Sequence, residues 1–274
     1  MSTVDNICHQ SAPRQRQRQD AGIPPRAICA FGQNDAFGML AVEALRQIWV
    51  DIPAMADLIS LLDTIATLEG DNPPRNFLGP VGVFQRETLP VRDAVLSLDV
   101  WGEDYSTPCQ AILVSALSTE TAAFTAYSRL KGKSWIVLTG SFTTALGFFD
   151  TLKRFNVTEG VVTSQVVPSP SSDLAIVADA REALGSAINL LSIEGFVVGR
   201  LALEGLRRAG DDLTPTGFAN ALLGHAFDIG GLQMDFTDDR HGSSDIFPQI
   251  LRQGQVLSVT QDQLVDELRV MSLR

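Results

Sequence analysis

The sequence predicts an α/β fold built on a parallel sheet, and three observations carry this prediction. Between Arg26 and Val166, short runs rich in β-branched and other apolar residues alternate with amphipathic stretches. The runs are mostly apolar rather than alternating, as is typical of strands buried on both faces. The chain has 274 residues and 45% apolar content, which is enough for substantial cores. We therefore expect parallel strands joined by right-handed crossover helices.

The strands and helices follow in order from this alternation. The predicted strands are residues 27–31, 80–84, 111–116, 134–139 and 160–166, and the predicted helices between them are 36–47, 90–98, 120–130 and 143–153. An additional amphipathic helix is predicted over 53–69, within an insertion at about 48–78. We expect it to pack on the surface of its own domain, with a lid or an oligomer contact as the alternatives.

The composition changes at both ends of this region. Residues 1–26 are rich in Arg, Gln and Pro and nearly free of apolar residues, which predicts a disordered tail. Residues 168–173 form a Pro/Ser-rich connector, and we expect a domain boundary there. Beyond it the pattern predicts helices at 173–184 and 190–209, a short helix from Thr214-Pro215 to Leu223, and strands at 232–236, 246–251 and 256–259.

The composition excludes several classes of function. The net charge of −11 argues against nucleic acid and against an anionic membrane surface as partners. No apolar run is long enough to span a bilayer, and the first 26 residues lack the hydrophobic stretch of a signal peptide. Cys8, Cys29 and Cys109 have no metal-ligand spacing; we expect Cys29 and Cys109 to be buried free thiols, with at most one disulfide as the alternative.

The motifs that could carry catalysis, a cofactor or a metal are absent or incomplete. The stretch FGQNDAFG, residues 31–38, fits neither phosphate-binding glycine pattern, and Asp35 near the following helix N-terminus would repel a phosphate. The three histidines have no metal-ligand spacing. Ser141 lacks the second glycine of a nucleophile elbow. We expect no enzyme activity, no cofactor and no metal.

The geometry of a parallel sheet still predicts a binding site. Ligands bind beyond the carboxyl ends of the strands in such sheets. The predicted strands bring four loops to that edge: 33–37, 85–89, 117–120 and 140–143. They supply an aromatic ring, hydroxyl groups and helix N-termini, without an acid, base and nucleophile that converge. Such a crevice can bind a ligand without transforming it.

Six stretches resemble the type I periplasmic solute-binding proteins, specifically the leucine/isoleucine/valine-binding group of ABC transporters. They agree in order and approximate spacing over residues 27 to 255. The stretches are FGQNDAFG at 31–38, QRET at 85–88, SQVVPSP at 164–170, LSIEGF at 191–196, GLRRAG at 205–210 and FDIGG at 227–231.

The resemblance implies two Rossmann-like lobes that close on a small solute, an amino acid or a related amide, without chemistry. Lobe 2 would be residues 27–166, residues 167–245 the remainder of lobe 1, and 246–274 strands that return to lobe 2. The ligand contacts carried over from the family fall on Phe37, on Leu117 or Ser118, and on Ser141 or Phe142. At the last two positions the family's aromatic and acidic contacts have no counterpart. A periplasmic or extracellular location and an ABC permease as partner are further implications.

The chain departs from the family at its start, where about half of lobe 1 has no counterpart. The helix at 190–209 would normally pack on that part of the lobe, so its apolar residues would be exposed. Their exposure would forfeit ~10 kcal/mol. We therefore expect that this helix packs differently, that its domain is only marginally stable, or that a partner covers the helix. The partner can be another copy of this chain. A ligand-sensing fragment of a membrane receptor is the alternative function.

Overall fold

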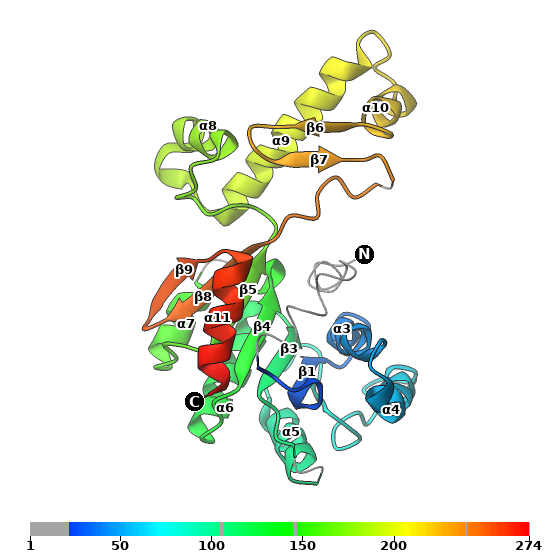
Figure 1. Cartoon of the computed structure of the whole chain (residues 1–274), viewed down its shortest axis with the longest axis vertical. Coiled ribbons are helices and arrows are strands. Elements are labelled where there is room, and N and C mark those ends of the chain that lie inside the picture. The colour runs from blue at the N-terminus through cyan, green and yellow to red at the C-terminus, as the bar shows by residue number, and fades with distance from the viewer. Residues whose placement is uncertain (1–21, 105–106, 145–146, 239, 274) are drawn as a thin grey trace. The chain divides into compact units, whose positions relative to one another are not determined.

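The structure, a computed structural model, describes residues 22–104, 107–144, 147–238 and 240–273. The chain divides into two compact units (Figure 1). Unit 1 comprises the residues up to Ser164 together with those from Pro248 onward, and unit 2 comprises Gln165–Phe247. Of the predicted disordered tail, residues 1–21 lie outside the described residues. Its last part was predicted wrongly, because a short η1 (Pro25–Ala27) forms there and the Trp49 indole N–H donates to the Pro25 carbonyl at 2.9 Å.

Unit 1 alternates strands and helices, as the sequence predicts. Its first part contains β1 (Ile28–Gln33), α3 (Met39–Trp49), η2 (Pro53–Met55), α4 (Ala56–Ala66), β2 (Val81–Phe84), α5 (Arg92–Asp104), β3 (Ala111–Ser115), α6 (Ser118–Leu130), β4 (Ile136–Gly140), η3 (Ser141–Thr143), α7 (Phe148–Arg154) and β5 (Val161–Gln165). The last part contains β8 (Phe247–Arg252), β9 (Gln255–Ser258) and α11 (Gln261–Ser272). The boundary residues Gln165 and Phe247 belong to strands of the same sheet.

In the described residues these strands form one seven-stranded sheet, in the order β2-β1-β3-β4-β5-β8-β9. The first five strands are parallel, with β1 between β2 and β3, and β9 runs antiparallel to β8. The predicted α/β fold with a parallel sheet is therefore confirmed. The predicted strand at 256–259 is also confirmed, but α11 was not predicted.

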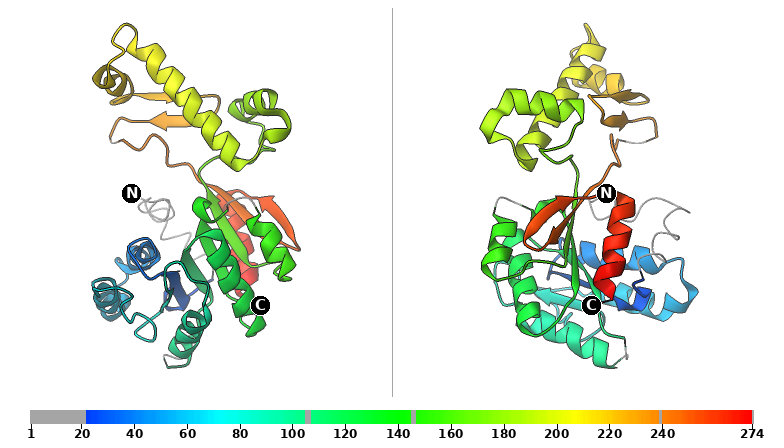
Figure 2. Two further views of the ribbon diagram at one scale, coloured as in Figure 1. Left: turned by 180° about the vertical axis from the view of Figure 1, so that it is seen from behind. Right: turned by 60° about the vertical axis from the view of Figure 1, so that its left-hand side comes forward.

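Helices cover both faces of this sheet. Helices α5, α6 and α7 lie on one face, and α3, α4 and α11 lie on the other (Figure 2). The predicted extra helix is α4, which packs on α3 of its own unit, as expected for a surface helix. Among the largest fully buried side chains are Phe31 on β1, Phe124 on α6 and Trp49 on α3, so the core extends through the sheet.

The outer edge of β2 is closed by a side chain from the insertion. The Asn76 amide accepts from the Val83 N–H at 2.7 Å and donates to the Val83 carbonyl at 2.9 Å. The Ser97 hydroxyl of α5 donates to the Val81 carbonyl at 2.8 Å. Free backbone groups on an edge strand invite pairing with another chain, so these bonds protect β2.

Cys29 and Cys109 form a disulfide, so the expectation of two free thiols was wrong. Their Cα atoms are 5.9 Å apart although 80 positions separate them in sequence. The reason is the sheet order, because Cys29 lies in β1 and Cys109 lies just before the neighbouring β3. Both residues are buried, and the bond ties β1 to the segment that leads into β3.

Unit 2 is a smaller helical unit with a two-stranded sheet. It contains α8 (Ala175–Leu184), η4 (Gly185–Ala187), α9 (Leu190–Ala209), α10 (Pro215–Leu222), β6 (Ala226–Asp228) and β7 (Gln233–Asp235). Ile176, Val197 and Phe227 belong to its core. The Thr214 hydroxyl caps α10 by accepting from the Gly217 N–H at 3.0 Å, with Pro215 in the first turn, as the sequence predicts. The predicted strand at 232–236 is shorter, as β7.

Helix α9 buries Ile193 and Val197 but leaves other apolar side chains exposed. Leu191, Val198, Leu203 and Leu206 are all at least 45% exposed. Assembly through this surface stays a prediction. Among the described helices, none combines the length and the apolar composition that crossing a bilayer requires.

Candidate functional site

The loop after β1, Gln33–Gly38, is held in one conformation by hydrogen bonds. The Asp35 carboxylate accepts from the N–H groups of Phe37 at 3.0 Å and Gly38 at 3.1 Å. The Ser115 hydroxyl at the end of β3 donates to the Phe37 carbonyl at 2.7 Å. Asp35 therefore lies at the helix N-terminus, as predicted, where it stabilises the turn and would repel a phosphate.

Phe37 and Phe142 come together at the carboxyl edge of the sheet. Their ring centroids are 5.3 Å apart in an edge-to-face arrangement, and both residues are half-buried. Ser141 begins η3, the short turn that also carries Phe142. These side chains follow β1 and β4, so parallel strands that are not consecutive in sequence bring them together.

Leu117 and Ser118 follow β3 at the same edge. Leu117 is the N-cap residue of α6 and is exposed, and Ser118 is half-buried. The Ala116 carbonyl before them accepts from the hydroxyl groups of Thr121 at 3.2 Å and Thr143 at 2.9 Å. The ends of β3 and β4 are therefore fixed to each other. That the five predicted residues contact a ligand stays a prediction.

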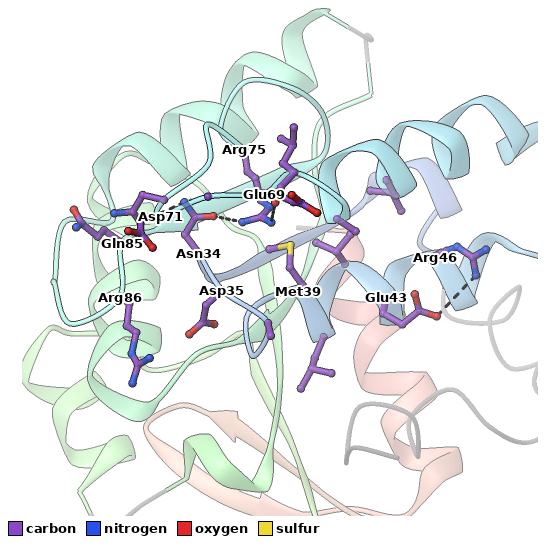
Figure 3. A pocket seen from close by; sticks show the side chains of 18 residues that line it. Asn34, Asp35, Met39, Glu43, Arg46, Glu69, Asp71, Arg75, Gln85 and Arg86 are labelled. Carbon is purple, nitrogen blue, oxygen red and sulfur yellow. Dashed lines mark hydrogen bonds and ion pairs between the residues drawn. The ribbon is translucent and has the colours of Figure 1, made fainter.

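An open pocket of about 800 Å³ lies beside the same loop (Figure 3). It is formed by the loop after β1, by α3 and α4, by the segment after α4 and by the start of the loop after β2. None of the five predicted contacts lines it. Its lining residues include Asn34, Asp35, Met39, Leu40, Val42, Glu43, Arg46, Leu62, Ala66, Leu68, Glu69, Asp71, Arg75, Gln85 and Arg86.

Arg75 is the buried cation of this pocket, only 5% exposed. Its guanidinium donates to the Ile65 carbonyl at 2.9 Å, the Leu68 carbonyl at 2.7 Å and the Asn34 side-chain oxygen at 2.6 Å. Burial lowers the pKa of Arg75, and the charge of Asp35 partly opposes that shift. The Asn34 amide also donates to the Pro73 carbonyl at 2.9 Å, so the insertion is fastened to the loop after β1.

Sequence reasoning missed Arg75 and Asn34. Asn34 lies in FGQNDAFG, a stretch in which only the glycines, Asp35 and Phe37 suggested a role. The insertion at about 48–78 carried no predicted binding residue. The polar sequence LEGDNPPRN at 68–76 was the available signal, but its position beside residue 34 depends on the tertiary fold.

Unit 2 has a smaller pocket of about 290 Å³, lined by Arg200, Leu203, Glu204, Arg207, Asp228, Ile229 and Gly230. Glu204 accepts from Arg207 at 2.7 Å and from Arg208 at 2.6 Å, and these bonds lower its pKa to about 2. Glu204 and Arg208 are four positions apart on α9, which is the spacing that favours such an ion pair. In the described residues no three or more His, Cys, Asp or Glu side chains gather as a metal site would require.

Three solved structures with the same fold are described as solute-binding or substrate-binding proteins. A possible leucine/isoleucine/valine-binding protein from Rhodopirellula baltica matches 96% of this chain with a TM-score of 0.71 and 22% identity, over 65% of its own length. A substrate-binding periplasmic protein from Ralstonia solanacearum matches 89% with a TM-score of 0.63 and 22% identity, over 64% of its length. A fatty acid ABC transporter substrate-binding protein from Thermomonospora curvata matches 94% with a TM-score of 0.65 and 16% identity, over 62% of its length.

The chain therefore has the type I periplasmic binding fold, with a Rossmann-like parallel-sheet lobe in unit 1. It spans less than two thirds of the length of these structures. No protein-family model matches the sequence, and no curated protein matches it.

Proposed function

We propose that this chain binds a small solute, an amino acid or a related amide, without transforming it. The observation that carries the proposal is the pair of Phe37 and Phe142 at the carboxyl edge of the unit 1 sheet. Aromatic faces, the apolar Leu117 and the hydroxyl groups of Ser118 and Ser141 suit a ligand with an apolar body and a few polar groups. The ligand would lie against this edge of the sheet.

The rigidity of the loop after β1 supports the same proposal. Asp35 and Ser115 hold the backbone around Phe37, so a ligand would meet a preformed surface. Preformed contacts bind more tightly, because less conformational entropy is lost on binding.

We also propose a periplasmic or extracellular location and an ABC permease as partner. The disulfide between Cys29 and Cys109 supports the location, because such bonds persist in oxidising compartments. The fatty acid ABC transporter substrate-binding protein from Thermomonospora curvata supports the choice of partner through its shared fold.

Isothermal titration calorimetry with a panel of amino acids and small amides tests the binding proposal. Phe37→Ala should weaken binding by about 1 to 3 kcal/mol, which is roughly tenfold to a hundredfold in Kd. Phe155→Ala is the matched control, since Phe155 is exposed at the opposite end of α7. If no compound gives a heat of binding, or if Phe37→Ala and Phe155→Ala bind with equal affinity, the surface around Phe37 is not the binding site.

A further inference from the structure

We propose that the pocket beside the loop after β1 is a second binding site, one that takes a small zwitterion with an apolar body. It lies within unit 1 and shares none of the five residues Phe37, Leu117, Ser118, Ser141 and Phe142. It is therefore independent of the proposed function. Three features of the pocket carry the proposal: a buried cation, a rim of unpaired carboxylates and an apolar wall.

The buried cation is Arg75. Its three hydrogen bonds go to two carbonyls and an amide oxygen, and no carboxylate of the described residues lies within ion-pair distance of it. The charge of Asp35 acts on Arg75 only from beyond that distance, and a buried charge without a direct counter-ion is costly, so structures normally pair it. Each terminal nitrogen of the guanidinium makes one of these bonds and has a further N–H group. A carboxylate on the ligand would supply the missing negative charge and accept from those groups.

The rim carries the opposite charge. Glu69 and Asp71 are exposed, and neither makes a hydrogen bond or ion pair with the described residues. The pocket's other arginines have acidic neighbours already, since Arg46 pairs with Asp63 at 2.7 Å and Arg86 lies 3.6 Å from Glu87. The free charge of the rim is therefore negative. A simple carboxylate would be repelled there, whereas a ligand that also carries a cationic group would be attracted.

The apolar wall lies between these charges. Its accessible part consists of Met39 and Leu40 from the start of α3 and of Ala66 and Leu68 from the end of α4 and just beyond it, while the lining residues Val42 and Leu62 are already buried. Figure 3 shows Met39 between the pair of Asn34 and Arg75 and the pair of Glu43 and Arg46. A short aliphatic chain on this wall would remove apolar surface from water. The volume of about 800 Å³ is within the usual range for small-molecule pockets.

Four compounds of equal carbon count separate the contributions: norvaline, δ-aminovalerate, valerate and pentylamine. Norvaline and δ-aminovalerate carry both charges at different separations, and the other two carry one charge each. Calorimetry on the whole chain should show at least one zwitterion binding about tenfold more tightly than valerate and pentylamine. If neither zwitterion binds more tightly than the singly charged compounds, the proposal is wrong.

Arg75→Gln should weaken zwitterion binding by about tenfold or more. Arg129→Gln is the matched control, because the half-buried Arg129 also donates to main-chain carbonyls, of Lys133 at 2.9 Å and Trp135 at 2.7 Å, away from the pocket. Binding that survives Arg75→Gln overturns the proposal. Binding that is lost in Phe37→Ala instead also overturns it, while leaving the proposed function in place.

A second variant keeps the test decisive if Arg75→Gln fails to fold. Glu69→Gln with Asp71→Asn changes only exposed side chains without partners. This double variant should bind zwitterion and valerate with similar affinity, because the rim no longer attracts the cationic group. An unchanged preference for the zwitterion would overturn the proposal.

Discussion

Replacing Cys29 and Cys109 together by alanine should greatly destabilise unit 1. The disulfide joins residues 80 positions apart. A cross-link that closes a loop of about 80 residues removes about 4.5 kcal/mol of chain entropy from the unfolded state at room temperature. The lost packing of two buried sulfur atoms adds about 1 kcal/mol each. Domains are typically stable by only roughly 5 to 15 kcal/mol, so the loss is a large part of the total.

Tryptophan fluorescence during urea unfolding measures this loss selectively. All three tryptophans of the chain, Trp49, Trp101 and Trp135, belong to unit 1, so unfolding of unit 2 does not contribute to the signal. The samples are the chain purified under oxidising conditions, the same chain after reduction, and the double variant. Reduction should shift the midpoint of the unaltered chain to lower urea and leave the midpoint of the double variant where it is.

A count of thiols decides whether the bond exists. With Cys29 and Cys109 bonded, the denatured, unreduced chain has one free thiol, that of Cys8, among its three cysteines. Three free thiols in the chain purified under oxidising conditions would show that the bond does not form, and a midpoint that reductant does not change would show that it does not stabilise unit 1.

Three further predictions concern the loop, the sheet edge and unit 2. Gly38→Ala should destabilise the chain by about 1 to 3 kcal/mol in urea unfolding, because a Cβ at residue 38 would overlap the main chain of Gln33. Gly195→Ala is the control and should stabilise the chain by about 0.5 to 1 kcal/mol, because a Cβ there meets open space on α9. Equal effects of the two substitutions would contradict this prediction. Asn76→Ala should lower the free energy of unfolding by about 2 kcal/mol, because two hydrogen bonds to β2 are lost. It should also promote association through the edge of β2, which light scattering measures. A fully monomeric variant of unchanged stability would show that the edge needs no protection. The pKa of Glu204 is lowered from 4.5 to about 2, so its contribution to the stability of unit 2 is complete above pH 4.5 and is lost as the pH falls toward 2. Glu204→Gln should remove this pH dependence of stability, measured by unfolding followed with circular dichroism. An unchanged pH profile in the variant would contradict this prediction.

The five parallel strands could be predicted because their signal is local. Each is an apolar run bounded by polar or turn residues, and each predicted run overlaps the strand that forms. The capped start of α10 and the pair of Glu204 and Arg208 were also predictable, since both depend on spacing within a turn or two.

Features that depend on tertiary neighbours could not be predicted. The disulfide needs β1 and β3 to be adjacent, and the hydrogen bond between Arg75 and Asn34 joins residues 41 positions apart. Helix α11 was missed for a different reason. Its signal is local and was overlooked, because Leu264, Leu268 and Met271 recur at helical spacing and the capping box of Thr260 and Gln263 is present in the sequence.

The sheet order has a consequence for how the protein is made. Strands β8 and β9 belong to the sheet of unit 1 but follow all of unit 2 in the chain. During synthesis β5 therefore remains an unpaired edge until the ribosome has added more than 80 residues beyond it. Over that interval the nascent chain exposes the edge of β5, which can pair with another molecule. A chaperone that covers this edge would prevent such pairing.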